Sequence, residues 1–285
     1  MASMRAEEGN PMPSDTLPVH KDASPNGEPK KTIRPSASSR LLSHLKTNIS
    51  LHYADFPVIF CCFVSGLCDS SAFNAWNTFV SMQTGNTIFL ALGASGQPPG
   101  EPYGWLKSLT SIFFFLCGCF FFAQTRRINA QARGTLSLSF FIQSVFIIIA
   151  ASLVQGRVVQ EPIGTVIEDS SVTHFKDLIP IGFLAFQSGG QIVASRLLGF
   201  NEVPTTVLTS VYCDLMSDVN MLVPFKENLK RNRRVAAAIA ILTGGICGGF
   251  ISKSKARMST SLWLAAGIKM VISLSWLLWK PKQTS

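Results

Sequence analysis

Two charged residues lie inside long apolar stretches of this sequence, where a charge is costly to bury. Asp69 lies in the stretch 57–76, and Lys269 lies in the stretch 262–279. A charged group in such a place needs a partner, bound water or a change of protonation. Asp69 is therefore a candidate for function by its position alone, with a structural cap or helix lock as the alternative.

Both charges lie seven residues from one end of their stretch. An ion pair between Asp69 and Lys269 would lower the cost of burying each of them. Lys269 has an alternative, because its flexible stem can carry the ammonium group to the lipid headgroups. The sequence leaves both interpretations of Lys269 open.

The densest cluster of uncharged polar residues follows the first of these stretches. It has five consecutive members: Gln83, Thr84, Gly85, Asn86 and Thr87. Amide and hydroxyl groups can ligate a cation or hydrogen-bond a solute, and Gly85 permits unusual backbone torsions. Irregular backbone at membrane depth is tolerated where it lines a cavity or is buried in protein. We predict a segment on a solute or ion pathway, the alternative being an ordinary helix start capped by Thr or Asn.

The second half of the chain carries a comparable set of polar residues. Its members are Gln187, Gln191, Thr206 and Thr209. The glutamines lie in an apolar stretch and the threonines in the segment that follows it, as in the first half. We include these four residues among the candidates for the pathway.

The apolar stretches that position these residues are long enough to cross a membrane. Only 14% of the 285 residues are charged, against about 25% in soluble domains. A membrane-spanning helix needs about 18 to 20 apolar residues. Six stretches have that length: 57–76, 106–123, 135–154, 178–195, 235–252 and 262–279. Two others, 79–93 and 203–218, are shorter and more polar. We predict an all-α integral membrane protein with about six spans and two short segments that are re-entrant or broken.

The distribution of Lys and Arg favours six spans over eight. If six stretches cross and the N-terminus is cytoplasmic, the cytoplasm receives the basic clusters 126–133 and 226–234. It also receives both chain ends, whereas the segment 155–177, with four acidic residues, lies outside. If all eight segments crossed, the cluster 126–133 would lie outside and violate the positive-inside rule. We therefore predict cytoplasmic termini.

The order of the segments repeats. Residues 55–154 and 178–280 each consist of a long stretch, a short segment and two further long stretches. With three spans in each half, the second half enters the membrane from the opposite side. Several secondary transporters have such an inverted repeat, in which paired interrupted segments build a site at the membrane midplane. The residue-by-residue match is weak, so the order of segments carries this hypothesis.

The membrane domain is predicted to occupy residues 53–280, between two polar tails. Residues 1–52 are rich in Pro, Ser, Lys and Glu and have almost no aliphatic runs. That composition predicts a disordered tail, within which residues 40–45 have the pattern of a short interfacial helix. Residues 281–285 form a short C-terminal tail.

Several other functions are not indicated. The positive charges behind the net charge of +9 lie between the apolar stretches, as topology determinants do, so we expect no nucleic-acid partner. The seven cysteines lack the spacing of a metal site and are expected to pack as small apolar residues. Motifs such as Gly-x-Ser-x-Gly and His-Glu-x-x-His are absent. We expect no enzyme activity, catalytic residue, metal or cofactor.

A few short motifs connect the chain with a known family. They are Gly66-x-x-Asp69, Phe79-x-x-Met82-x-Thr84-Gly85-Asn86, Gly190-Gln191 and Thr206-x-x-Thr209. Over roughly residues 55–280 the chain resembles the YoaK-like family, a multi-pass membrane domain of unknown function (number 1275). The Met-x-Thr-Gly-Asn element is the most specific part, and the tail and the segment 155–177 resemble a fungal-type member. The resemblance implies a membrane fold and brings no substrate or catalytic residues.

The candidate residues favour a secondary transporter or permease for a small solute or ion. Asp69 and the cluster 83–87 would lie near its pathway. The alternative is a non-transporting membrane scaffold or sensor, in which the polar residues only lock helices together. The expected partners are the lipid bilayer and an unknown small solute or ion. The sequence selects no particular substrate, coupling ion, membrane or oligomeric state.

Overall fold

The computed structural model describes residues 36–97, 103–159, 175–254 and 257–283. The chain divides into two units, Met1–Ser36 and Ala37–Ser285, and every described helix belongs to the second unit. The described residues form α-helices and short 3-10 turns, with two isolated β-bridges. The all-α prediction is confirmed.

Six of the helices are long and apolar enough to cross a membrane. They are α2 (Asp55–Trp76), α4 (Gly104–Ala123), α5 (Arg133–Gln155), α6 (Leu178–Leu197), α8 (Leu229–Lys253) and α9 (Arg257–Leu278). The 3-10 turn η1 (Gln124–Ile128) extends α4, and η2 (Phe175–Asp177) leads into α6. The six helices coincide with the six predicted stretches, which makes the chain a multi-pass membrane protein.

Helix α8 begins six residues before the apolar stretch that predicts it. Its first turns are strongly basic, so a hydropathy criterion excludes them. The helix nevertheless starts there because the side chain of Asn228 accepts a hydrogen bond from the backbone N–H of Arg231 at 2.9 Å. The guanidinium of Arg231 donates in turn to the carbonyl oxygens of Met221 and Val223, each at 2.6 Å. Capping and these bonds extend the helix beyond its apolar part.

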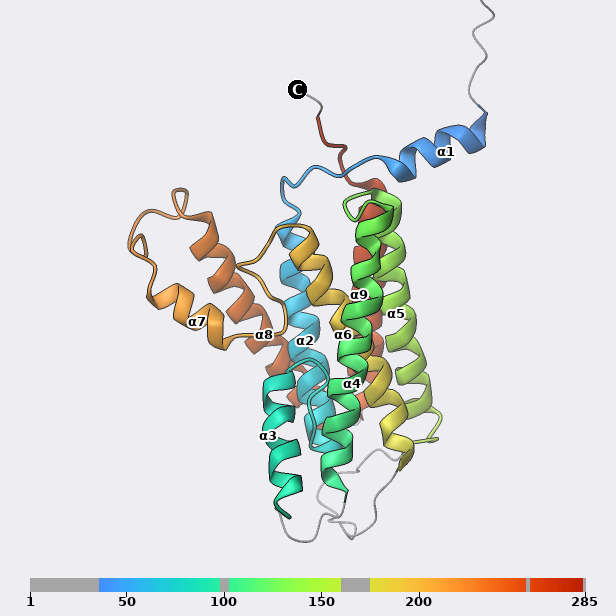
Figure 1. Cartoon of the computed structure of the whole chain (residues 1–285), viewed down its shortest axis with the longest axis vertical. Helices are drawn as coiled ribbons and strands as arrows, with labels where there is room; N and C mark the ends of the chain where they lie inside the picture. The colour runs from blue at the N-terminus through green and yellow to red at the C-terminus, as the bar shows by residue number, and fades with distance from the viewer. Residues whose placement is uncertain (1–35, 98–102, 160–174, 255–256, 284–285) are drawn as a thin grey trace, which may run out of the picture. The chain divides into compact units, whose positions relative to one another are not determined.

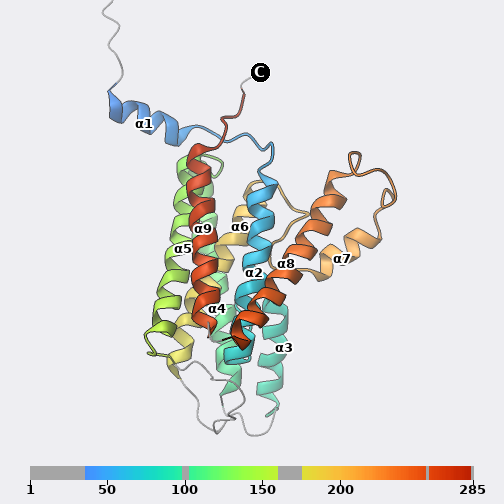
Figure 2. The same cartoon turned by 180° about the vertical axis from the view of Figure 1, so that it is seen from behind.

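The long helices pack in three pairs, α2 with α8, α4 with α6, and α5 with α9 (Figures 1 and 2). Helix α5 also contacts α6, and α2 also contacts α9, so these four helices form the centre of the bundle. Hydroxyl groups join α5 to α9. Ser144 donates to the carbonyl oxygen of Ala266 at 2.9 Å, and Ser273 donates to that of Ser137 at 2.7 Å. Such bonds are a common link between helices in a membrane.

Helices α2 and α8 cross so closely that only glycine fits between them. A Cβ atom at Gly66 would lie 2.1 Å from the carbonyl oxygen of Ile241. A Cβ atom at Gly244 would lie 2.1 Å from the carbonyl oxygen of Phe63. Glycines on both helices therefore set the distance between the two backbones, as small residues do in membrane helix pairs.

Helices α4 and α6 have a crossing of the same kind. A Cβ atom at Gly118 would lie 2.1 Å from the carbonyl oxygen of Phe186. A Cβ atom at Gly189 would lie 2.5 Å from the carbonyl oxygen of Phe115. Both helix pairs thus depend on a glycine from each partner.

Two short helices follow breaks in the chain. Helix α3 (Gln83–Ala94) follows residues 77–82, the first break, and α7 (Thr209–Met216) follows residues 198–208, the second break. At 1.5 Å per residue they are about 18 Å and 12 Å long, well below the ~30 Å of a bilayer core. Helix α3 lies beside α4, whereas α7 lies with the first part of α8, apart from the other helices (Figures 1 and 2).

The last part of the predicted tail is ordered and contains a helix where the sequence predicts a short one, at residues 40–45. Residues 1–35 lie outside the described residues, but Ala37–Lys46 form a helix, α1. Ile49 follows it and is fully buried. Its neighbour Asn48 accepts a hydrogen bond from the backbone N–H of Lys282 at 2.8 Å. The buried side chain and the backbone pairing, which composition does not reveal, order this segment and bring it beside the end of α9.

A single added methyl group tests the α2–α8 crossing. Gly244→Ala places a Cβ atom against the carbonyl oxygen of Phe63, whereas nothing lies within 4 Å of a Cβ atom at Gly249. We expect Gly244→Ala to lower the stability by about 1–3 kcal/mol through overpacking. Gly249→Ala should be neutral or stabilising, because Ala favours a helix over Gly by about 1 kcal/mol. Thermal unfolding in detergent measures both, and equal melting temperatures for the two variants would contradict the close crossing.

Candidate functional site

The carboxylate of Asp69 holds the first break against α2. The helix ends at Trp76, because Asn77 adopts the left-handed conformation (φ 54°), which Asn tolerates better than most residues. The chain then turns back to Asp69, two helical turns earlier. Its Oδ1 accepts hydrogen bonds from the backbone N–H groups of Val80 and Ser81, both at 2.8 Å, and its Oδ2 accepts one from the hydroxyl of Ser81 at 2.5 Å. The carboxylate thus satisfies backbone donors that no water reaches at this depth.

Asn86 of α3 binds the first part of the first break, at Thr78 and Phe79. Its Oδ1 accepts from the hydroxyl of Thr78 and from the N–H of Phe79, each at 3.0 Å. Its Nδ2 donates to the carbonyl oxygen of Phe79 at 2.7 Å, to Oε1 of Gln83 at 2.9 Å and to the hydroxyl of Ser111 at 3.0 Å. The Asn86 amide is therefore fully satisfied within the protein.

The other predicted members of the cluster 83–87 lie elsewhere. Thr84 and Thr87 are exposed on α3, and the hydroxyl of Thr87 donates to the carbonyl oxygen of Gln83 in its own helix. Gly85 allows the ring of Phe79 to pack against the backbone, since a Cβ atom there would lie 2.8 Å from that ring. The structure does not bring these three residues together with Asp69.

The predicted threonines of the second half also separate. Thr206 is buried, and its hydroxyl donates to the carbonyl oxygen of Pro204 at 3.4 Å. Thr209 begins α7 and is exposed. Thr205, which follows Pro204, is buried with a positive φ of 58°. Its hydroxyl has no hydrogen-bond partner within the described part of the chain. The second break is held mainly by Ser195, whose hydroxyl donates to the carbonyl oxygens of Phe200 and Val203 at 3.0 and 2.6 Å.

Lys269 occupies the centre of the bundle. It is fully buried, so its ammonium group does not reach the headgroups. It donates to Oε1 of Gln143 at 2.7 Å, and its Nζ lies 5.2 Å from the centre of the Phe140 ring. The alternative, an ion pair with Asp69, does not form within the described parts of the chain either. The reason is that α9 begins at Arg257, which moves Lys269 to the middle of its helix and away from the first break.

Gln191 joins the same central region from α6. Its Nε2 donates to the hydroxyl of Ser65 at 2.7 Å and to the carbonyl oxygen of Cys61 at 3.1 Å. The side chain of Cys61 also interacts with Lys269. We call Ser65, Gln143, Gln191 and Lys269 the midplane cluster, because it lies near the middle of α2, α5 and α9.

Two oxygen atoms of α6 have no hydrogen-bond partner among the residues that the structure describes. They are Oε1 of Gln187 and Oε1 of Gln191, on side chains that are 2% and 1% exposed. The two residues are four positions apart and therefore lie on one face of the helix. A buried amide oxygen without a hydrogen bond costs about 1–3 kcal/mol, so this face is prepared to accept hydrogen bonds from a further group.

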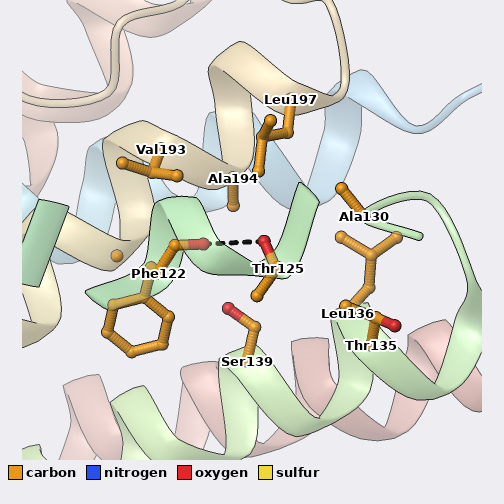
Figure 3. Close-up of a pocket in the computed structure, with 10 residues that line it drawn as sticks. Phe122, Thr125, Ala130, Thr135, Leu136, Ser139, Val193, Ala194 and Leu197 are labelled. Carbon is orange, nitrogen blue, oxygen red and sulfur yellow. Dashed lines mark hydrogen bonds between the residues drawn. The ribbon is translucent and has the colours of Figure 1, made fainter. Parts of the chain in front are cut away.

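A small pocket lies between α4, α5 and α6 (Figure 3). Its walls include Thr125, Ser139 and Val193, and its space is sufficient for about one water molecule. The hydroxyl of Thr125 is turned to the carbonyl oxygen of Phe122, at 2.7 Å. Ser139 accepts a hydrogen bond from Nε2 of Gln143 at 3.3 Å. One wall of the pocket therefore contacts the midplane cluster.

Most of the membrane domain of this chain matches a known family. The family described as "Protein of unknown function (DUF1275)" matches residues 58–275. The chain belongs to this family. The match confirms the family resemblance seen in the sequence and covers nearly all of the region between α2 and α9. Comparisons with curated proteins and with solved structures found no match.

The sequence did not single out several polar residues that build the centre of this DUF1275 protein. They are Ser65, Ser81, Ser111, Gln143 and Ser188. Serine is common in membrane helices as a small packing residue, so its type alone gives little signal. Gln143 is different, because it is the largest polar side chain in the stretch 135–154. That feature was visible in the sequence.

Asp69 provides a test of the first break in this DUF1275 protein. Asp69→Ala leaves the N–H groups of Val80 and Ser81 without an acceptor, and we expect a loss of about 2–5 kcal/mol in stability. Asp69→Asn keeps one oxygen for these donors and should cost less. Asn74→Ala, at an exposed position of the same helix, is the control and should change stability by no more than about 0.5 kcal/mol. Unfolding in detergent measures all three, and an Asp69→Ala protein as stable as the control would exclude the locking role.

Proposed function

We propose that this DUF1275 protein is a secondary transporter for a small solute, built from two inverted repeats, residues 55–155 and 178–278. The supporting observation is a set of contacts that recurs with the two halves exchanged. In one set α2 packs against α8, and in the other α6 packs against α4. In each pair, the first helix of one half (α2 or α6) contacts the second long helix of the other half (α8 or α4). Transporters with inverted repeats interlock their halves and bind the solute between them.

The glycine crossings give the most detailed correspondence. A Cβ atom at Gly66 would lie 2.1 Å from the carbonyl oxygen of Ile241 and 2.8 Å from the nitrogen four residues further along α8. A Cβ atom at Gly189 would lie 2.5 Å from the carbonyl oxygen of Phe115 and 2.7 Å from the nitrogen four residues further along α4. Ile241 follows Phe115 by 126 positions (241 − 115). The same atoms therefore meet in both crossings.

Two ion pairs, at opposite ends of the bundle, also join the first helix of one half to the second long helix of the other. Arg233, near the start of α8, pairs with Asp55 at the start of α2 at 2.9 Å. Lys107, near the start of α4, pairs with Asp177 just before α6 at 3.9 Å. Arg233 also follows Lys107 by 126 positions (233 − 107). A basic residue thus ties the second long helix of each half to the first helix of the other.

The two breaks support the same arrangement. The carbonyl oxygen of Val80, in the first break, accepts a hydrogen bond from Ser188 of α6 at 2.8 Å. The thiol of Cys62, in α2, interacts with the backbone of Thr205 in the second break. Each break therefore packs against the first helix of the opposite half. In transporters of this type, interrupted segments meet near the midplane and border the solute site.

The repeats differ in conformation, as alternating access requires. Helix α3 packs along α4, whereas α7 lies with the first part of α8 and apart from the other helices (Figures 1 and 2). In an inverted-repeat transporter, exchange of the two conformations between the halves closes one side and opens the other. The unequal positions of α3 and α7 fit one of these two states.

We assign the end of the bundle that carries η1 and the start of α8 to the cytoplasm. Arg126 and Arg127 lie in η1, and Lys230 and Arg234 lie in the first turns of α8. Positive residues next to membrane spans remain on the cytoplasmic side. Both described chain ends belong to that side, because Ile49 pairs with Pro281. No enzymatic step is proposed for the polar residues.

Reconstitution in liposomes tests the transport function. The purified protein should exchange an external labelled solute for the same solute trapped inside, in a saturable manner that empty liposomes lack. A panel should include organic anions, organic cations, sugars and inorganic ions. Ligands that stabilise the protein in thermal unfolding, by RT ln(1 + [L]/Kd), are tested first. Absence of exchange for every stabilising ligand would favour the scaffold or sensor instead.

A further inference from the structure

We propose that Lys269 and Gln143 bind a small anion, a carboxylate that also carries a hydrogen-bond donor, on the axis relating the two repeats. The inference rests on the proposed transporter and names the substrate class of its site. The first observation is the distance in sequence between these two residues. Gln143 and Lys269 contact each other at 2.7 Å and are 126 positions apart, the same offset that relates α4 to α8 in the glycine crossings and the ion pairs.

Two equivalent residues can contact each other only where they are close to the axis that exchanges them. Gln143 and Lys269 therefore mark the axis between the repeats, in the middle of α5 and α9. A ligand on that axis keeps its surroundings when the halves exchange conformations. It is thus the place at which a solute can remain while access changes from one side to the other.

The charge of Lys269 indicates what the site binds. The ring of Phe140, 5.2 Å from Nζ, and the amide oxygen of Gln143 both favour an ammonium group. A buried cation in a membrane costs several kcal/mol without a counter-ion. No carboxylate lies within ion-pair distance of Lys269 in the described part of the protein. Asp69, the acidic residue of α2 that is buried, is already engaged by Val80 and Ser81. A bound anion supplies the missing charge.

The unpartnered amides of α6 indicate the second feature of the ligand. Gln191 contacts the carbonyl oxygen of Cys61, whose side chain interacts with Lys269. Among the described residues, Oε1 of Gln191 and Oε1 of Gln187 have no donor and can each accept a hydrogen bond. The choice between oxygen and nitrogen in each amide is an assignment from hydrogen bonding, and Gln191 is fixed because Nε2 must donate to the Cys61 carbonyl oxygen. A hydroxyl or ammonium group on the anion would satisfy these oxygens.

A route to the site begins at the pocket of Figure 3. Ser139 lines that pocket and accepts a hydrogen bond from Nε2 of Gln143, whose Oε1 holds Lys269. Gly190, next to Gln191 on α6, also lines this pocket. The pocket is therefore separated from Lys269 by one side chain, Gln143. A rotation of that amide would join the two.

The first experiment measures binding by thermal unfolding of the purified full-length protein with four related probes. Glycolate is an anion with a donor, acetate is an anion without one, glycolamide is neutral and ethanolamine is a cation. At about 100 mM, a ligand with a millimolar Kd gives a measurable stabilisation. We expect glycolate to stabilise most, acetate less, and the neutral and cationic probes not at all. Absence of stabilisation by both anions would overturn the proposal.

Variants assign the effect to the site. Lys269→Met removes the charge at similar volume, and apolar replacement of a buried charge is usually tolerated. It should weaken glycolate binding by about tenfold or more. Lys269→Arg should retain part of the binding, and Lys282→Met, at an exposed position, should retain all of it. Gln191→Leu should abolish the preference for glycolate over acetate. Unfolding without ligand shows whether each variant is folded, and a folded Lys269→Met protein that still binds glycolate would refute the site.

Uptake of labelled glycolate into liposomes separates this inference from the proposed function. Uptake by the wild type that is lost in Lys269→Met supports both. Binding that depends on Lys269 without any uptake upholds the anion site and contradicts the transporter. Exchange of some other solute that is unchanged in Lys269→Met upholds the transporter and contradicts the anion site.

Discussion

The close approach of helix backbones at the two glycine crossings is the constraint on which the rest of this structure depends. Where Gly66 meets Ile241 and Gly189 meets Phe115, a side chain of any size would separate the helices. In a membrane there is little hydrophobic force between helices, so packing at short range has to hold them together. The crossings hold α2 against α8 and α6 against α4, and Gln191 of α6 reaches Ser65 and Cys61 of α2 between these two pairs.

A second constraint follows from the absence of water at that depth. The backbone N–H and C=O groups of each break lack the partners that a helix provides. They therefore need other hydrogen-bond partners from the protein. In the first break, Asp69 and Asn86 accept the backbone N–H groups. In the second, Ser195 donates to the carbonyl oxygen of Val203 at 2.6 Å. Asp69 is therefore explained by the backbone that it holds, and a role in binding solute is not needed to account for its burial.

Lys269 differs from Asp69 in this respect. The hydrogen bonds of Asp69 serve the fold, whereas Lys269 is held by one amide, a ring face and a thiol. In the proposed repeats Gln143 occupies the place of Lys269 in the first half, so the two halves differ in charge at this position.

The sequence by itself determined the class of fold, because long apolar stretches can be stable only as membrane helices and each was long enough to recognise. It also indicated two short segments, 79–93 and 203–218, which overlap the helices α3 and α7, and it gave the family through the Met-x-Thr-Gly-Asn element. The ends of α1, α8 and α9 were harder to predict from the sequence. They depend on caps such as Asn228 and on pairings such as Asn48 with Lys282, which lie outside the apolar pattern.

Only the tertiary structure decided which polar residues meet. Asp69 and Lys269 lie at equal distances from the ends of their apolar stretches, and nothing in either stretch shows that they belong to different hydrogen-bond networks. Gln83 and Asn86 looked like Thr84 and Thr87 in sequence, yet the helix turns the amides inward and leaves the hydroxyls exposed. The physical reason is that a hydrogen bond depends on the rotation of a helix and on the neighbour at its crossing. Both are set by packing between segments more than a hundred residues apart, as for Gln143 and Lys269.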